Sequence, residues 1–375
     1  MANWIADDFL SFVVALVLAG IIIPQILLIA FRKNLFDEID SRKIHQGVVP
    51  RLGGIAFFPS ILFALAIVVG INMKLFGFEM YGYFFNSIVP IYFMICAVLL
   101  MYLVGIADDL VGVRYSAKFI VQILASVLVI FSGIYVNNLY GFLYLHQLPD
   151  WFAWLVTSFA VVYIVNAINL IDGIDGLASG LSTVAFIYYA IVLYLGGEYV
   201  YSMLASAGAG TLLPFFYYNV FGNANKQKKI FMGDAGALTT GMILVFLAIT
   251  VVREDVPEMT PDYNPLVTAL SPLLIPCFDV VRVYIHRVAR RRNPFLPDKC
   301  HIHHKLLALG LNQRMALCVI LVWSVVFIII NTLLSPYMNP TWLIGGDVAV
   351  WTLINMAMTR AISSREKKIG EKIYD

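Results

Sequence analysis

Long apolar stretches recur along most of this chain, and each could cross a lipid bilayer as a helix. A helix needs about 20 apolar residues to cross roughly 30 Å of hydrocarbon. Of the 375 residues, 61% are hydrophobic and 13% are charged, whereas soluble domains have roughly 45–50% and about 25%. The sequence therefore predicts an all-α, polytopic integral membrane protein. The eleven expected spans are 9–31, 52–73, 88–106, 117–136, 151–171, 177–195, 200–221, 236–252, 266–286, 315–334 and 342–360.

Basic residues are divided very unevenly between the two alternating sets of loops that these spans create. Of the 25 Lys and Arg residues, only Lys74 and Arg253 fall on one side. Short cytoplasmic loops carry the excess of basic residues in membrane proteins. We therefore expect the N-terminus outside and the C-terminus in the cytoplasm. We also expect one membrane-embedded domain over 1–375, ending in a basic cytoplasmic tail at 361–375.

A row of polar side chains closes the fifth expected span. Asn166, Asn169, Asp172 and Asp175 recur every third residue, so on a helix they share one side. Lipid would make such a row costly, and it therefore indicates a functional site facing protein or water. The alternative is a polar seam that holds neighbouring helices together.

Paired carboxylates end the third expected span. Asp108 and Asp109 are adjacent, and Lys118 follows nine residues later, at the start of the next span. Adjacent carboxylates repel each other unless a cation, a proton or a basic side chain compensates their charge. The pair could otherwise be ordinary solvated charge at the membrane surface.

Asp234 lies between two glycines, Gly233 and Gly236, at the start of the eighth expected span. Glycine lets the backbone come close to a ligand, although an Asp at a helix start can also be a simple N-cap. Asn219 ends the preceding span, and Gly53 and Gly54 begin the second span in the same manner.

The longest loop on the basic side combines arginines with histidines. It carries Arg287, the run Arg290–Arg292, and then His301, His303 and His304. The histidine spacing does not match a structural zinc pattern. Histidines beside arginines suit a phosphate site better, although the arginines could serve only to orient the loop or to contact anionic lipid.

These groups would all meet at one face of the membrane, from five different loops. Carboxylate and amide oxygens suit a hard ion, usually Mg²⁺ shared with phosphates. Arginines, lysines and histidines supply further phosphate donors. Such a site can catalyse phosphoryl transfer largely by positioning and charge neutralisation.

The arrangement resembles the polyprenyl-phosphate N-acetylhexosamine-1-phosphate transferase superfamily over nearly the whole membrane core. The segments that carry the resemblance are Arg42-Lys-x-His45 with Pro50-Arg-Leu-Gly-Gly54, Asp108-Asp109 with Lys118, Asn166 to Ala178, Phe231-Met-Gly-Asp-Ala-Gly236, and His301-Ile-His-His304. The histidine motif, which Ile302 interrupts, is similar to that of the branch whose enzymes begin the synthesis of surface glycans. The peptidoglycan branch usually has three consecutive histidines.

The resemblance implies a role for each of these residues. Mg²⁺, or Mn²⁺, would be bound by Asp234 and Asn169. The catalytic set would be Asp108 or Asp109 at the lipid phosphate, Lys118 neutralising charge and Asp172 supporting the network. The substrate-binding set would be Asp175 and Asn219 at the uridine, Arg287, His301, His303 and His304 at the sugar phosphate, and His45.

The implied reaction joins N-acetylglucosamine-1-phosphate from UDP-N-acetylglucosamine to undecaprenyl phosphate at the cytoplasmic face of the bacterial inner membrane. The lipid bilayer is the surrounding partner, a homodimer is compatible with the family, and no nucleic acid is expected. Two alternatives remain open. One is a sister transferase for another UDP-N-acetylhexosamine or for UDP-N-acetylmuramoyl-pentapeptide. The other is an ion-coupled transporter, whose ionisable groups would be expected near the midplane.

Overall fold

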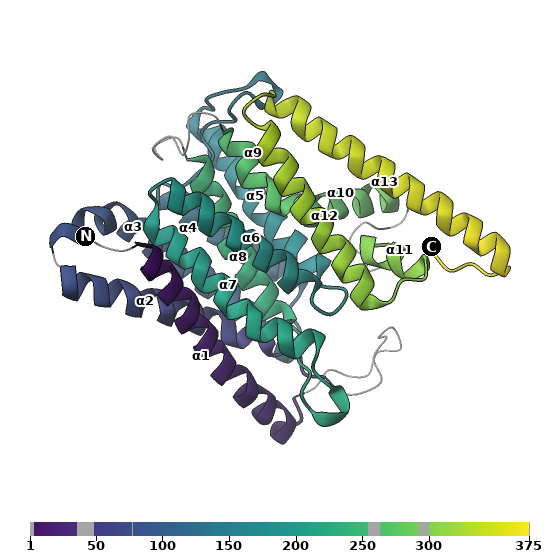
Figure 1. Cartoon of the computed structure of the whole chain (residues 1–375), viewed down its shortest axis with the longest axis horizontal. Coiled ribbons are helices and arrows are strands. Elements are labelled where there is room, and N and C mark those ends of the chain that lie inside the picture. The colour runs from purple at the N-terminus through teal and green to yellow at the C-terminus, as the bar shows by residue number, and fades with distance from the viewer. Residues whose placement is uncertain are drawn as a thin grey trace.

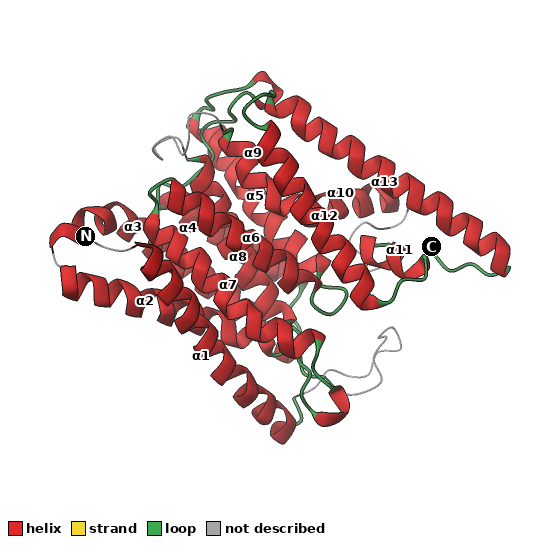
Figure 2. Ribbon diagram, in the orientation of Figure 1, coloured by secondary structure: helices red, strands yellow, loops and turns green. Residues whose placement is uncertain are grey.

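The computed structural model describes residues 4–35, 49–76, 78–253, 263–291, 293 and 300–374, with the side chains of 76–86 left aside. His45, expected in the substrate site, lies outside the described residues. Within those residues the regular structure is entirely helical, apart from an isolated bridge between Asn138 and Gln147. The expectation of an all-α chain is confirmed, and Figure 2 shows the helices in red.

The helices follow the expected spans closely. In chain order they are α1 (Trp4–Lys33), α2 (Phe57–Phe76), α3 (Phe78–Val111), α4 (Tyr115–Phe131), α5 (Asp150–Ile171), α6 (Leu177–Leu195), α7 (Tyr199–Val220), α8 (Gly233–Val252), α9 (Pro265–Leu270), α10 (Leu274–Ala289), α11 (Ile302–Ala308), α12 (Gln313–Leu334) and α13 (Pro340–Ile369). Short 3₁₀ helices are η1 (Gly53–Ala56), η2 (Phe142–Tyr144), η3 (Ala224–Lys226) and η4 (Ser271–Leu273).

Eight of the described helical segments are long and apolar enough to cross a membrane. Seven are α1, η1 with α2, α3, α5, α6, α8 and α12, and the eighth is the stretch Pro265–Ala289, which contains α9, η4 and α10. The three other expected spans are also helices. Of these, α4 has only 17 residues, while α7 and α13 contain more small or polar residues. The expected tail at 361–375 begins as a continuation of α13.

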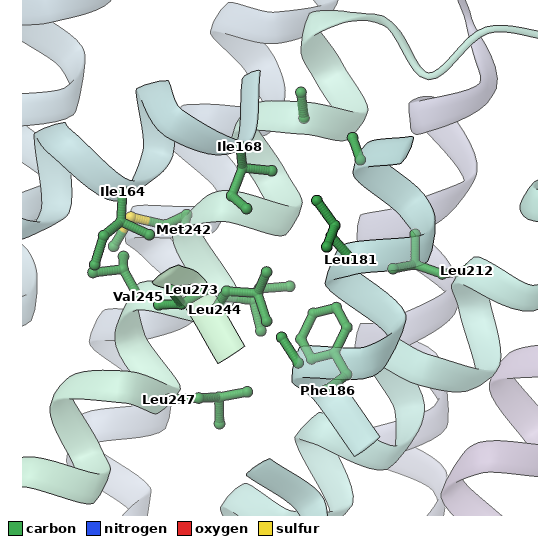
Figure 3. Packing of buried hydrophobic residues seen from close by; sticks show 14 of the residues in the cluster. Ile164, Ile168, Leu181, Phe186, Leu212, Met242, Leu244, Val245, Leu247 and Leu273 are labelled. Atoms are coloured by element: carbon green, nitrogen blue, oxygen red, sulfur yellow. The ribbon is translucent and has the colours of Figure 1, made fainter. Parts of the chain in front are cut away.

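Helix α8 forms the centre of the bundle. Every residue from Ala235 to Val252 is buried, and α3, α5 and α6 pack against it. Figure 1 shows α8 among these helices, with α13 along one side of the molecule. Apolar side chains such as Ile168 of α5 and Phe186 of α6 fill the space around Leu244 (Figure 3). Because these helices enclose α8, they fix the position of its first turn and of the polar side chain that this turn carries.

The chain before α2 is hydrogen-bonded to the chain before α8. The N–H of Gly53 donates to the carbonyl oxygen of Phe231 at 3.0 Å, and Gly54 donates to Met232 at 2.9 Å. A Cβ atom on Gly54 would lie 1.9 Å from the backbone nitrogen of Gly236. The glycines at the start of the second span therefore permit a close backbone contact with α8.

Helix α3 crosses the start of α8 at a second glycine. A Cβ atom on Gly105 would lie 2.4 Å from the Cα atom of Ala235. We expect Gly105→Ala to destabilise the protein by about 1–3 kcal/mol, because the added methyl group overpacks a rigid backbone contact. Thermal unfolding of the detergent-solubilised protein measures this loss.

Gly345→Ala is the matched control, because Gly345 also lies in a helix but has no atom within 4 Å of its ideal Cβ position. A Gly105→Ala protein that unfolded at the same temperature as Gly345→Ala would show that α3 and α8 are not in tight contact.

Candidate functional site

Lys118 lies between two of the expected catalytic carboxylates. Its Nζ atom is 2.8 Å from Oδ2 of Asp108 and also forms an ion pair with Asp234. The carboxylates come from the end of α3 and the start of α8, and the lysine from the start of α4. About a fifth to a quarter of each side chain is exposed, so a ligand could reach all three.

Asp109 has a different environment from its neighbour. Its Oδ1 accepts a hydrogen bond from the backbone N–H of Asp234 at 2.8 Å, and its Oδ2 accepts one from Ala235 at 2.9 Å. The first N–H groups of a helix have no partner within the helix and carry a partial positive charge. Asp109 therefore caps α8 from another helix, which leaves the Asp234 side chain free to pair with Lys118.

Gly233 makes this close capping possible. Its φ of +69° lies in the left-handed region, and a Cβ atom there would lie 2.1 Å from the carbonyl oxygen of Arg51 and 2.6 Å from Oδ2 of Asp109. A larger residue would be strained in its backbone and would displace the Asp109 carboxylate.

The loop between α5 and α6 is fixed by two contacts from the end of α7 and the segment after it. Asp175 Oδ2 is 2.6 Å from Nζ of Lys229. Asn219 accepts a hydrogen bond from the N–H of Gly176 at 2.6 Å and donates to the carbonyl oxygen of Ile230 at 2.8 Å. The buried amide of Asn219 therefore ties this loop to the segment that leads into α8.

Asp172 lies in the same loop, directly after α5. Its side chain is exposed on one side, but the surrounding protein, reinforced by the charges of Asp175 and Asp234, raises its pKa to about 7. Arg51 opposes this shift. Asn169, one turn earlier, is half-buried. Charges at the ends of the second, fifth and eighth expected spans therefore act on one another here.

Asn166, the first member of the polar row, belongs to a contact between helices. Its Nδ2 donates to Oε1 of Gln122 at 2.7 Å, and Nε2 of Gln122 donates back to Oδ1 at 3.3 Å. Gln122 is buried on α4. The first residue of the row therefore belongs to a seam between helices, whereas Asp175 at its end pairs with Lys229.

The histidine segment packs directly against the 172–176 loop. A Cβ atom on Gly173 would lie 2.2 Å from Cε1 and Nε2 of His303. The ring of His303 is buried, and neither of its nitrogens has a hydrogen-bond partner among the described residues. Burial lowers the pKa of His303 well below its usual value, and the nearby His304 and His301 lower it further. His303 is therefore a neutral imidazole at neutral pH.

The other members of the segment surround His303. The ring centroid of His301 lies 5.8 Å away in a parallel stack, and that of His304 lies 4.2 Å away. Arg287, in the last turn of α10, is buried.

Asp279 is a residue that sequence reasoning missed. It is fully buried on α10, and its Oδ2 lies 2.8 Å from Nδ1 of His301. The available signal was an acidic residue inside an apolar span, which is itself an indication of function. The apolar pattern of 266–286 predicts only a span and does not link Asp279 to His301.

No group of three His, Cys, Asp or Glu side chains is arranged to hold a metal ion in the part of the chain that the structure describes. Mg²⁺, however, usually takes only one or two protein carboxylates and completes its shell with water and substrate phosphates. The oxygen donors around Asp234 fit that pattern, whereas a zinc site at the histidines is not formed.

A large apolar cavity lies between α5, α8, α9, α10 and α13. Its volume is about 1240 Å³. Its wall includes Phe159, Tyr163, Leu273 and Trp351, and the end formed by the last turns of α10 and α13 carries Arg282, His286, Arg360 and Lys367. A long hydrocarbon chain with an anionic end would match this distribution of apolar and basic groups.

This chain is similar in sequence to known proteins. Residues 91–252 match the family model described as glycosyl transferase family 4. The undecaprenyl-phosphate alpha-N-acetylglucosaminyl 1-phosphate transferase of Yersinia pestis is 31% identical over 78% of this chain and 74% of its own length. A probable enzyme of that kind from Bacillus subtilis is 30% identical over 84% and 82%. The Escherichia coli K12 enzyme is 28% identical over 84% and 80%.

The contacts of Asn219 lead to a test of its role. We expect Asn219→Ala to lower the free energy of unfolding by about 1–3 kcal/mol, because the buried N–H of Gly176 and carbonyl of Ile230 lose their partner. Thermal unfolding measures the change. Asn223→Ala is the control, because its side chain accepts hydrogen bonds only in an exposed turn. Equal stability of the Asn219→Ala and wild-type proteins would instead favour direct contact of this amide with a ligand.

Proposed function

This chain belongs to glycosyl transferase family 4, and we propose that it transfers N-acetylglucosamine-1-phosphate from UDP-N-acetylglucosamine to undecaprenyl phosphate, with release of UMP. The observation that best supports this proposal is the cluster of Lys118, Asp108 and Asp234 beside the loop that holds Asp172 and Asp175. It joins a phosphate-neutralising lysine to carboxylates from several helices. The names of the relatives support the same donor sugar and acceptor lipid.

The cavity supports a lipid acceptor. Its wall is mainly apolar, and basic groups lie at one end. A polyprenyl chain would bury apolar surface along this wall, which is favourable by about 25 cal/mol for each Å² removed from water. Its phosphate would then lie at the same end of the bundle as Asp108.

The donor would bind at the loop between α5 and α6 and at the start of α8. Asp234 and Asn169 would hold Mg²⁺, or Mn²⁺, which neutralises charge on the diphosphate when bound. Lys118 would also neutralise phosphate charge. Asp175 would contact the uridine, with Asn219 positioning that loop, and Arg287, His301, His303 and His304 would enclose the sugar phosphate.

The proposed reaction is a single displacement. An oxygen of the lipid phosphate attacks the phosphorus attached to N-acetylglucosamine, a new P–O bond forms, and the bond from that phosphorus to UMP breaks. The products are a lipid diphosphate sugar and UMP. Asp108 faces Lys118 and is the better placed of the pair to orient the lipid phosphate, while Asp109 holds the start of α8.

The multi-pass chain would cross the bacterial inner membrane eleven times, with its N-terminus outside and its C-terminus inside. The uneven distribution of basic residues supports this orientation. The reacting groups would then face the cytoplasm, where nucleotide sugars are made.

A panel of UDP-sugars tests the donor. With purified protein, undecaprenyl phosphate and Mg²⁺, we expect UMP release and a lipid product whose mass matches the addition of N-acetylglucosamine phosphate. Asp234→Ala should lower turnover by about 100-fold or more, as loss of charge stabilisation does elsewhere. A lipid product formed only from a muramoyl-pentapeptide donor would replace this proposal by the sister activity.

Removal of the metal tests the cation. We expect EDTA to abolish UMP release and added Mg²⁺ or Mn²⁺ to restore it, because the diphosphate would otherwise carry uncompensated charge. Ca²⁺ is the control for a nonspecific divalent ion and should restore less activity. Full turnover after exhaustive chelation would show that Asp234 and Asn169 are not ligands of a required metal ion.

A further inference from the structure

We propose that Asp279 is a positioning residue that fixes His301 for binding of the nucleotide-sugar donor. The inference rests on the proposed function, because it gives His301 a place at the donor's phosphate. It adds a residue inside a membrane helix that acts on the donor only through its hold on the histidine segment.

The first argument is the contact between the two side chains. Oδ2 of Asp279 lies 2.8 Å from Nδ1 of His301. Three donor groups surround the carboxylate, namely His301, Arg282 and the backbone N–H of Ile302. A carboxylate with several donors is stabilised in its charged form and can only accept hydrogen bonds. Nδ1 of His301 must therefore carry the proton, and the ring orientation is set.

The second argument is that the backbone on both sides of His301 is held as well. The N–H of Ile302 donates to Oδ1 of Asp279 at 3.0 Å. Nη2 of Arg282 lies 2.7 Å from the same oxygen and also donates to the carbonyl oxygen of Cys300. The side chain of His301 and the peptide groups on either side of it thus contact one carboxylate and its arginine, while the Cys300 carbonyl also accepts a hydrogen bond from Tyr374.

The third argument is the direction in which His301 is held. Its ring is parallel to that of His303, at an interplanar angle of 3°. The ring of His303 in turn contacts Gly173, in the loop that bears Asp172 and Asp175. A displaced His301 would therefore disturb the side of the site that is assigned to the donor.

The burial of Asp279 indicates that this residue does not serve stability alone. A buried carboxylate costs several kcal/mol unless it is paired, and an apolar residue often serves stability as well or better. In metal sites, a carboxylate behind a histidine fixes the tautomer and orientation of the ring, and its loss costs about 10- to 100-fold. Asp279 has the same relation to His301.

The experiment compares Asp279→Asn, His301→Ala and the double variant as full-length proteins in nanodiscs. We expect Asp279→Asn to raise the KM for UDP-N-acetylglucosamine by about 10-fold, by analogy with such carboxylate–histidine pairs. The KM for undecaprenyl phosphate should change less, since Asp279 reaches the basic end of the cavity only through Arg282. In the His301→Ala background, Asp279→Asn should cause no additional loss, because residues that act through one contact are not additive.

Asp347→Asn is the matched control. Asp347 is also a buried carboxylate on a helix, and it accepts a hydrogen bond from Asn331 at 2.9 Å. It should lower thermal stability without separating the two KM values. If Asp279→Asn yields too little folded protein, Asp279→Glu carries the test with the same expectation, because it keeps a carboxylate but displaces it by one methylene.

Three results would overturn the inference. The first is an equal change in both KM values. The second is an Asp279→Asn protein that, like Asp347→Asn, loses thermal stability without separating the two KM values. The third is a fully additive loss in the double variant. Each requires an active wild-type protein, so each would leave the proposed function intact. A wild-type protein that turns over no UDP-sugar would instead reject the proposed function and this inference together.

Discussion

The capping of α8 by Asp109 is the interaction on which the polar end of the bundle depends. Two backbone N–H groups at the start of a wholly buried helix need partners, and a carboxylate from α3 supplies both. Glycines at 54, 105 and 233 allow the surrounding backbone to come close enough. The position of Asp234 follows from this capping, and the positions of Lys118 and Asp108 follow from Asp234.

Charge compensation explains how so many ionisable groups can share one end of an apolar bundle. Lys118 is shared by two carboxylates, Lys229 pairs with Asp175, and Asp279 is surrounded by donors. Uncompensated charges of one sign would repel one another strongly where water is scarce. A phosphorylated ligand would add negative charges to this balance, which suits a site that carries Lys118 and Lys229.

Much of the fold could be predicted because its signals are local. Apolar length and basic loops are properties of short segments, and all eleven expected spans are helices in the structure. The proximity of Asp108, Lys118 and Asp234 was also expected, but only the packing of α3, α4 and α8 shows which carboxylate holds the lysine. Asn166 with Gln122, and Asp279 with His301, pair residues that are distant in sequence. No periodicity within one segment carries that information.

The enclosure of α8 has a consequence for the order in which the protein is made. Seven helices precede α8 along the chain, and α3, α5 and α6, which surround it, are among them. Until α8 is made, those helices lack the partner that they surround, and Asp109 lacks the two backbone N–H groups that donate to it. The arrival of α8 fills the centre and satisfies that carboxylate in one event. Ribosome-bound chains shorter than about 250 residues would therefore lack the innermost helix, and α9 to α13 would join the bundle only after it.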